Sequence, residues 1–472
     1  MGKSASVVVI GAGPAGLAAA YELTKQGAGA VVLEKDSVVG GLSRTVEYKG
    51  FRCDIGGHRF FTKISYVDGL WHEIMGQSFL RRPRLSRIYY RGKFYNYPLN
   101  VGNALKNLGP LKSLAVFGSL IRSKLLPYRP ETSFTHWVSN RFGRRLFNMF
   151  FRTYTEKVWG ISCDRLSADW AAQRIKNLSL TKAVLRAMGI GGKKAIASLI
   201  DEFNYPALGP GQLYETMADR AKAAGAELHL NSPVTRIEHD GRKVTAVCTG
   251  DGQARRFEVG RAAFSSMPLD ELVLSLTPPP PAEVVEAARG LHYRSILTVN
   301  LLLNQAQLVP DNWIYIHDPH VVAGRMQLYK NWSPQMVPDA AQSVIGMEYF
   351  CTEGDELWTS PAERLVETAT ADLRRIGIAD PDAVFDSFVV RYPKAYPVYD
   401  EGYAERLATI RAFLAGLANL YPVGRYGQFR YNNMDHSILT AHFSVRKLNG
   451  EDIDPWSVNT EAEYHEEKDK AE

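Results

Sequence analysis

The sequence lacks the features of disulfide-rich, zinc-binding and membrane-spanning proteins. Its few cysteines are widely separated, with no CxxC pair and no histidine spacing suited to zinc: Cys53, Cys163, Cys248 and Cys351. No apolar run reaches the length of about 18 residues that a membrane span requires, and no signal peptide precedes the first predicted strand. We therefore expect no metal site, no stable membrane insertion and a cytoplasmic location.

An excess of one charge is also missing. The chain has 56 Lys and Arg against 50 Asp and Glu, a net charge of +6 over 472 residues, which is too dilute for a nucleic-acid surface unless it is clustered. One basic and aromatic cluster lies between Arg81 and Tyr97, a composition that also suits single-stranded nucleic acid. Within it, alternating residues flank Arg91-Gly92, which favours a β-hairpin with a polar turn. We expect no nucleic-acid partner.

The most informative segment is at the start of the chain, where an apolar strand at 7–10 runs directly into a glycine-rich turn. The turn reads Gly11-Ala12-Gly13-Pro14-Ala15-Gly16 and opens an alanine-rich helix. In a dinucleotide-binding unit the first glycine permits the tight turn, the second lets the backbone approach the phosphates, and the third lets the helix pack close to the strand. A second strand, 30–33, ends at Glu34, 23 residues after Gly11, where a carboxylate can meet the ribose hydroxyls of adenosine. The sequence therefore predicts a dinucleotide site.

The residues after Glu34 favour FAD as the dinucleotide. The stretch Gly40-Gly41-Leu42-Ser43-Arg44 is more typical of flavin enzymes than of nicotinamide enzymes, and together with the complete βαβ unit it resembles the FAD-binding fold of the amine oxidase type. NAD in place of FAD, and a glycine turn without any ligand, remain alternatives at this point.

Signals of one nucleotide-binding domain recur in three separated parts of the chain. Short alternating strands occupy 228–259, and a late strand with a glycine turn lies at 419–427. Between these parts, apolar residues recur at helical spacing from Leu105 to Ile121, and 296–303 is the clearest strand of a second part. The predicted fold is α/β, with a Rossmann-like FAD-binding domain, an inserted helical subdomain and an antiparallel β-sheet substrate subdomain. We expect the FAD-binding domain at 1–75, 203–270 and 415–455, the helical insert at 100–202, the strand-rich substrate domain at 76–99 and 276–414, and a polar tail at 456–472.

Four motifs in these parts resemble one enzyme family. Thr153-Tyr154-Thr155-Glu156-Lys157-Val158-Trp159-Gly160 is similar to the YTEKxWG motif of the UDP-galactopyranose mutases. Gly57-His58-Arg59-Phe60-Phe61-Thr62 is similar to their GxHxFHT loop, and Tyr293-Arg294-Ser295 to their YRS/T strand. The segment from Gly424 to Asp435 is similar to their C-terminal GRxGxYxYxDMD motif. These motifs span most of the chain.

The resemblance implies a nucleotide-sugar mutase in which N5 of reduced FAD acts as the nucleophile on the anomeric carbon. Such a reaction consumes no net electrons, so an external reductant only primes the flavin. Its diphosphate leaving group calls for guanidinium groups, which bind phosphate oxygens in a fork. We expect a small-molecule partner, a nucleotide sugar, and allow for a homo-oligomer.

The resemblance also assigns site residues. The candidate catalytic residues are His58, Arg294 and Arg174. The candidate substrate-binding residues are Tyr154, Trp159, Tyr396, Tyr431 and Asn433. The candidate cofactor-binding residues are Gly11, Gly13, Pro14, Ala15, Gly16, Glu34, Lys35, Gly41, Leu42, Arg44, Gly57, His58, Val234, Gly424, Arg425, Asn433 and Met434. For the arginines a surface salt bridge, and for the aromatic residues core packing, are the competing interpretations.

Three departures from the family pattern leave the reaction open. Phe61 stands where the mutases have a second histidine, Asn433 stands where they have an aspartate, and Phe429 replaces a tyrosine. Two other functions therefore remain: an FAD-dependent oxidoreductase that acts on a sugar, nucleotide sugar or amine, similar to amine or protoporphyrinogen oxidases, and a flavin-binding protein without chemistry.

Overall fold

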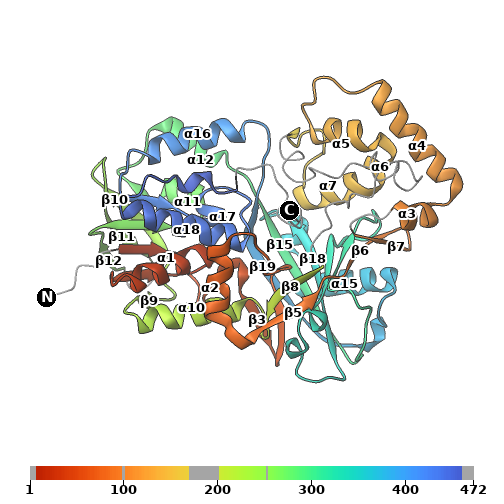
Figure 1. Cartoon of the computed structure of the whole chain (residues 1–472), viewed down its shortest axis with the longest axis horizontal. Coiled ribbons are helices and arrows are strands. Elements are labelled where there is room, and N and C mark those ends of the chain that lie inside the picture. Colours follow the sequence, from red (N-terminus) through yellow and green to blue (C-terminus); the bar gives the residue numbers. More distant parts are fainter. Residues whose placement is uncertain (1–6, 98–100, 169–200, 251–253, 460–472) are drawn as a thin grey trace.

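The computed structural model describes residues 7–97, 101–168, 201–250 and 254–459. Figure 1 shows a parallel sheet with its helices on one side of the molecule and a long antiparallel sheet beside it. A group of helices lies at the outer edge above the second sheet.

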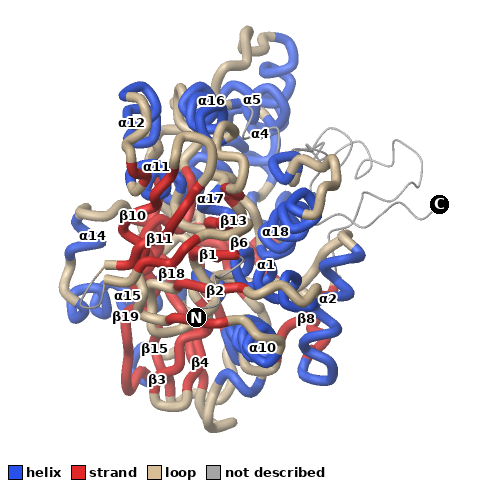
Figure 2. Tube along the Cα trace, turned by 90° about the vertical axis from the view of Figure 1, so that its left-hand side faces the viewer, coloured by secondary structure: helices blue, strands red, loops and turns tan. Residues whose placement is uncertain are grey.

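The parallel sheet has the strand order β20-β13-β1-β2-β9, and its strands come from distant parts of the chain. They are β1 (Val7–Ile10), β2 (Ala30–Leu33), β9 (Glu227–His229), β13 (Ala262–Ser265) and β20 (Leu420–Pro422). Because β1, β2 and β13 are buried along their whole length, they are almost entirely apolar and show no polar alternation. One face packs on three helices that Figure 2 shows beside the sheet, α1 (Pro14–Lys25), α10 (Gly211–Ala223) and α18 (Met434–Leu448).

The other face of the parallel sheet is covered by a four-stranded sheet of order β12-β11-β10-β14. Its strands are β10 (Val234–His239), β11 (Val244–Thr249), β12 (Arg256–Glu258) and β14 (Leu276–Thr277). Three helices complete this core, α11 (Leu269–Leu274), α12 (Ala282–Arg289) and α16 (Tyr403–Leu414).

The largest sheet is mostly antiparallel and has the order β19-β15-β18-β17-β16-β6-β7. Its strands are β6 (Ser86–Tyr90), β7 (Lys93–Asn96), β15 (Tyr293–Leu303), β16 (Trp313–Ile316), β17 (Arg325–Leu328), β18 (Ser343–Cys351) and β19 (Val384–Pro397), and α15 (Ala362–Ile376) packs on it. The predicted hairpin is confirmed: Tyr90 pairs with Lys93, and Arg91 and Gly92 both have positive φ, 50° and 72°, as a two-residue type I′ turn requires.

The outer helices are α3 (Val101–Leu108), α4 (Pro110–Leu125), α5 (Phe134–Phe142), α6 (Arg144–Phe147) and α7 (Thr153–Trp159), with a π-helical turn at Asn148–Arg152. The remaining elements are short: β3 (Thr45–Tyr48) with β4 (Phe51–Asp54), β5 (Phe79–Pro83) with β8 (Glu202–Pro206), α2 (Ser65–Met75), α13 (Tyr329–Trp332), α14 (Glu356–Thr359) and α17 (Gly424–Gly427). Among the residues described, no helix combines the length and apolar character needed to cross a membrane. The predicted α/β fold class is confirmed, and the domain boundaries stay predictions.

Candidate functional site

The glycine turn after β1 forms a cradle at the N-terminus of α1. A Cβ on Gly16 would lie 1.9 Å from the carbonyl oxygen of Gly11, so only glycine allows this approach of helix and strand. Gly11 has a φ of +92°, which also favours glycine. Gly13 is the N-cap and, in the described structure, no side chain caps this helix; Pro14 and Ala15 form the first turn. Pro14 has no backbone N–H, so the amides of Ala15 and Gly16 are left for an anionic ligand.

Glu34 lies beside this cradle at the end of β2. Its carboxylate accepts hydrogen bonds from the backbone N–H of Ala12 (2.6 Å) and Asp36 (2.9 Å). Burial raises the pKa of Glu34, and these two amides act in the opposite direction. Each carboxylate oxygen keeps a second lone pair that can accept from a ribose hydroxyl. Its neighbour Lys35 is exposed, and Val234 begins β10 close by, because Ser232 N–H donates to Glu34 O (2.8 Å).

The turn from Gly40 to Arg44 closes over the cradle. Gly40 N–H donates to Ala12 O at 2.8 Å, and a Cβ on Gly41 would lie 3.3 Å from the Gly13 Cα. Arg44 pairs with Asp36 at 2.6 Å. Leu42, next to Gly41, packs in the same apolar cluster as Trp159 and Tyr396. The turn therefore connects the predicted phosphate site to the aromatic residues Trp159 and Tyr396.

The C-terminal motif reaches the cradle from the opposite side. A Cβ on Gly424 would lie 2.8 Å from the Ala15 Cβ, so this glycine packs directly on the first turn of α1. Asn433 is the N-cap of α18 and donates its backbone N–H to His436 Nδ1 (3.2 Å), and Met434 is the first residue of that helix. Glu34, the turn from Gly40 to Arg44 and Gly424 of the C-terminal motif thus all contact the glycine turn or the first turn of α1.

His58 lies near Arg425 of the C-terminal motif and near Arg325 of β17. Its Nε2–H donates to Ile55 O at 3.0 Å. Burial lowers the pKa of His58 to about 4, and the cationic Arg425 and Arg325 act in the same direction. Gly56, two residues before His58, has a φ of +95°, and a Cβ there would lie 3.5 Å from an Arg325 Nη. The imidazole is therefore neutral at physiological pH.

Three predicted substrate residues, Trp159, Tyr396 and Tyr431, form an aromatic wall beside Arg425. The Arg425 guanidinium lies 4.4 Å from the Tyr431 ring centroid and 5.3 Å from that of Tyr396. Trp159 lies 6.1 Å from Tyr431 and 6.4 Å from Tyr396, centroid to centroid. Tyr154, on the other side of α7, stacks on His317 at 4.7 Å. The structure thus brings Trp159, Tyr396 and Tyr431 together. Tyr154 packs against the same apolar cluster, but its ring stacks on His317.

The Tyr154 and Tyr396 phenols remain protonated at neutral pH. Burial raises the pKa of Tyr396 to about 12, and it raises that of Tyr154 well above the ordinary value for a tyrosine. The cationic Arg325 partly opposes both shifts. Neutral phenols beside guanidinium groups can donate hydrogen bonds to an anion.

Arg325 is a site residue that the sequence reasoning missed. It lies opposite Glu348 in the register of β17 and β18, and its Nε and one Nη donate to a Glu348 Oε at 2.7 and 2.5 Å. The same Nη lies 3.5 Å from the Tyr396 hydroxyl. Burial lowers the pKa of Arg325, but the Glu348 carboxylate outweighs this effect and the net shift is upward. Only the strand register, which the sequence does not reveal, pairs these residues across the 22 positions between them.

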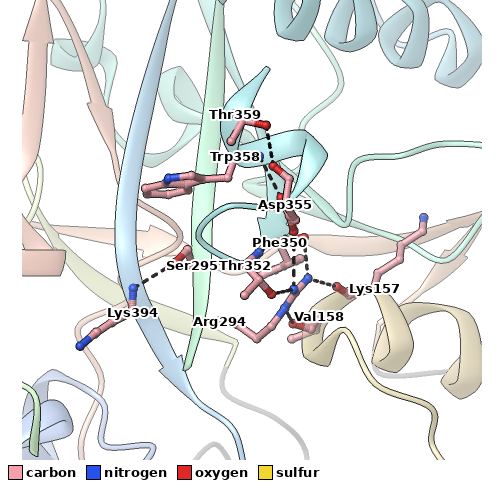
Figure 3. Close-up of polar contacts among 10 residues, drawn as sticks. All are labelled: Lys157, Val158, Arg294, Ser295, Phe350, Thr352, Asp355, Trp358, Thr359 and Lys394. Carbon is pink, nitrogen blue, oxygen red and sulfur yellow. Dashed lines mark hydrogen bonds and ion pairs between the residues drawn. The ribbon is translucent and has the colours of Figure 1, made fainter. Parts of the chain in front are cut away.

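Arg294 lies close to the wall but is engaged by the protein itself, as Figure 3 shows. Its guanidinium donates to three backbone carbonyl oxygens, Phe350 O (2.7 Å), Val158 O (3.3 Å) and Lys157 O (3.4 Å), and to the hydroxyl of Thr352. It therefore holds the C-terminal end of α7 against β18. Its predicted contact with a diphosphate stays a prediction, and Arg174 lies outside the described residues.

Lys157 fixes the same helix from another direction. Its Nζ donates to four backbone carbonyl oxygens at and after the end of β16, Asp318 and Val321 at 2.7 Å and Ile316 and Ala323 at 3.2 Å. Burial lowers the pKa of Lys157 to about 8. The positions of Tyr154 and Trp159 on α7 thus depend on two cations that are held by backbone carbonyl oxygens.

Two of the residues that depart from the family pattern pack in apolar cores. Phe429 is almost fully buried and contacts Tyr293, with centroids 5.1 Å apart. Phe61 packs against the cluster that contains Trp332. No group of three or more His, Cys, Asp or Glu suited to a metal occurs in the described part of the chain.

Comparisons with known proteins identify the family and the fold. Residues 14–447 match the family described as flavin containing amine oxidoreductase. The putative flavin-containing monoamine oxidase AofH of Mycobacterium tuberculosis (strain ATCC 25618 / H37Rv) is 27% identical over 297 residues, 60% of this chain and 61% of that protein. The phytoene dehydrogenase of Streptomyces griseus is 27% identical over 296 residues, 52% of this chain and 51% of that protein. The chain thus spans between half and two thirds of the length of these curated relatives.

Solved structures extend the likeness to nearly the whole chain. The crystal structure of reduced UDP-galactopyranose mutase superposes with a TM-score of 0.82 at 22% identity and covers 98% of this chain and 100% of that chain. A putative protoporphyrinogen oxidase from Exiguobacterium sp. 255-15 gives a TM-score of 0.71 at 18% identity, with 95% and 100% covered. At these identities the likeness is one of fold.

Proposed function

The chain belongs to the flavin-containing amine oxidoreductase family, and we propose that this flavin-dependent enzyme isomerises the sugar ring of a nucleotide sugar without net oxidation. FAD is the cofactor of the family. The residues present fit it: the cradle at α1 offers uncapped amides, Glu34 offers a carboxylate that can accept from ribose hydroxyls, and Gly41 and Gly424 keep side chains out of the cradle.

When bound and reduced, FAD supplies a nucleophilic ring nitrogen for the anomeric carbon. The protein must then bind the diphosphate that departs and hold the sugar close to the flavin. Arg425 and Arg325 supply positive charge, and Tyr396 and Tyr431 offer hydroxyl groups to phosphate oxygens. Because a diphosphate leaves as a stable anion, it needs these donors and no proton from an acid, which agrees with a neutral His58.

The observation that carries the proposal is the aromatic wall around Arg425. Arg325 is paired with Glu348, and Arg425 donates to Asn432 O (2.9 Å) and Ala395 O (3.0 Å), so the protein itself holds both cations beside the rings of Tyr396 and Tyr431. An oxidase of apolar amines or hydrocarbons has no use for cations and phenols gathered at this place. An anionic leaving group makes use of all of them. Arg294 and Arg174 keep the anchoring roles that the motif resemblance implies.

An FAD-dependent oxidoreductase is the second candidate, and two observations favour it. The curated relatives named above are an oxidase and a dehydrogenase. Phe61, which replaces a second histidine of the mutase loop, packs in a core and leaves no titratable group at that position. On this alternative the flavin takes hydride from a sugar, nucleotide sugar or amine.

The experiment incubates dithionite-reduced holoenzyme with UDP-galactose, UDP-glucose and their dTDP and GDP counterparts under anaerobic conditions. The proposal predicts a ring-isomerised sugar in chromatography while the flavin spectrum stays reduced, and no turnover by oxidised enzyme. Stoichiometric bleaching of oxidised flavin by any of these sugars, without an isomer, would establish the oxidoreductase. Failure of every nucleotide sugar to react or to bind would refute both nucleotide-sugar functions.

A further inference from the structure

The outer helices expose an unusual amount of apolar side chain. Of eleven large apolar side chains that are exposed in the described residues, six lie between 111 and 126. They are Leu111, Leu114, Phe117, Ile121, Leu125 and Leu126, with exposed fractions from 42% to 82%. Soluble proteins scatter such residues singly, so a cluster of this kind indicates an interaction surface.

These side chains form one stripe along α4. At about 100° per residue, Leu111, Leu114, Phe117, Ile121 and Leu125 fall within about 120° of the helix circumference. The opposite side packs inward, with Leu120 buried and Val116 against the core of the helical group. The helix therefore has two apolar faces, and within the part of the chain that the structure describes only the inner one packs on other residues. Figure 1 shows α4 at the outer edge of the molecule, on the side away from the parallel sheet.

Basic residues border the stripe on both sides. Arg122 and Lys124 are exposed and fall just outside the two edges of the apolar arc. The chain from 91 to 130 contains seven basic residues and no acidic residue: Arg91, Lys93, Lys106, Lys112, Arg122, Lys124 and Arg129. Within the described residues, Lys112, Arg122 and Lys124 form no ion pair with a carboxylate. The outer face of α4 thus combines an apolar centre with an unneutralised basic rim.

We propose that this face of α4 docks on the surface of an anionic lipid bilayer, with the apolar stripe in the headgroup region and Arg122 and Lys124 on acidic headgroups. A helix with a wide apolar stripe and basic borders lies in the interface plane and does not cross the bilayer. A second copy of the chain fits less well, because a two-fold contact would bring the same basic residues of both copies together without an acidic partner. The inference is independent of the proposed reaction.

The test is co-sedimentation of the full-length holoprotein with vesicles of phosphatidylcholine alone or with a third phosphatidylglycerol. Wild type is expected in the pellet only with the anionic vesicles, and release by salt is expected because the attraction to headgroups is screened. The double variant Arg122→Gln/Lys124→Gln should partition about 30-fold more weakly, since each basic residue near such a surface contributes about fivefold. Leu114→Ser/Ile121→Ser should lose binding as well.

A matched control separates this surface from general stickiness. Val38→Ser/Phe385→Ser removes two side chains of similar exposure, 49% and 46%, outside α4 and should bind like wild type. Retained FAD absorbance and melting temperature show that each variant is folded. Equal binding to neutral vesicles, no binding by wild type, or unchanged binding by the α4 variants would overturn the proposal. A dimer in light scattering that the α4 variants dissociate, without lipid binding, would overturn it in favour of a second copy.

Discussion

Replacing Arg294 with alanine tests whether this buried cation also serves the nucleotide. The substitution removes four internal hydrogen bonds and leaves the Phe350, Val158 and Lys157 carbonyl oxygens without this donor. A buried acceptor left unsatisfied costs about 1–3 kcal/mol, and relaxation of α7 recovers part of this. We expect a net loss of about 2–4 kcal/mol, in the range of the larger single substitutions, and a lower melting temperature.

The consequence for ligand binding follows from the position of α7. Its C-terminal end carries Trp159, which packs on Tyr396 and Tyr431, so release of this end disturbs the wall. A direct phosphate contact would add to this effect. We expect UDP to bind about 10- to 100-fold more weakly, as for the loss of a charge-assisted hydrogen bond. The FAD content should stay unchanged, because Arg294 contacts α7, β18 and Thr352 and the cradle at α1 is a different part of the fold.

Calorimetric titration with UDP and absorbance at the flavin band measure the two effects on one sample. Arg294→Lys is the matched variant: it keeps a cation but cannot reproduce the fork on several carbonyl oxygens. If Arg294→Lys binds UDP like wild type but keeps the low melting temperature of the alanine variant, the positive charge at this position contributes to nucleotide binding. UDP affinity within twofold of wild type in the alanine variant would refute the anchoring role and leave Arg294 as a support of α7.

Three further predictions concern the cradle, the wall and the loop. Gly13→Val places a side chain where the cofactor phosphates approach, so the purified protein should lack the yellow flavin absorbance; retained colour would contradict the position of the cradle. Tyr396→Phe keeps the ring that packs on Arg425 and removes only the hydroxyl, so UDP should bind about tenfold more weakly with an unchanged melting temperature; equal UDP affinity would exclude the phenol as a donor. Because the folded-state pKa of His58 is lowered to about 4, its neutral form stabilises the fold above about pH 6.5 and that contribution is lost as the pH falls toward 4. Melting temperatures from pH 7 to 4 should therefore fall more steeply for wild type than for His58→Gln, and parallel curves would contradict this.

The sequence predicts local features of this protein well because they depend on neighbouring residues. The strand, turn and helix around Gly11, the hairpin at Arg91-Gly92 and the long strand at 296–303 all follow from short patterns, and the structure contains each of them. The fold class follows from the same patterns.

Features that depend on pairing between distant segments were not predictable in the same way. The ion pair of Arg325 and Glu348 exists because β17 and β18 align in one register. The carbonyl partners of Arg294 and Lys157 are backbone atoms, which no side-chain pattern reports. The helical spacing from Leu105 to Ile121 predicted a helix but could not say that Leu111, Leu114 and Ile121 face outward, since two faces of α4 are apolar.

The central claim is that a nucleotide diphosphate binds at the aromatic wall, opposite the flavin. A crystal structure of the reduced holoenzyme with UDP tests it most directly. The account predicts phosphate oxygens within hydrogen-bond distance of the Tyr396 and Tyr431 hydroxyls and close to Arg425. A UDP molecule bound elsewhere, or a wall that stays without nucleotide at saturating UDP, would contradict it.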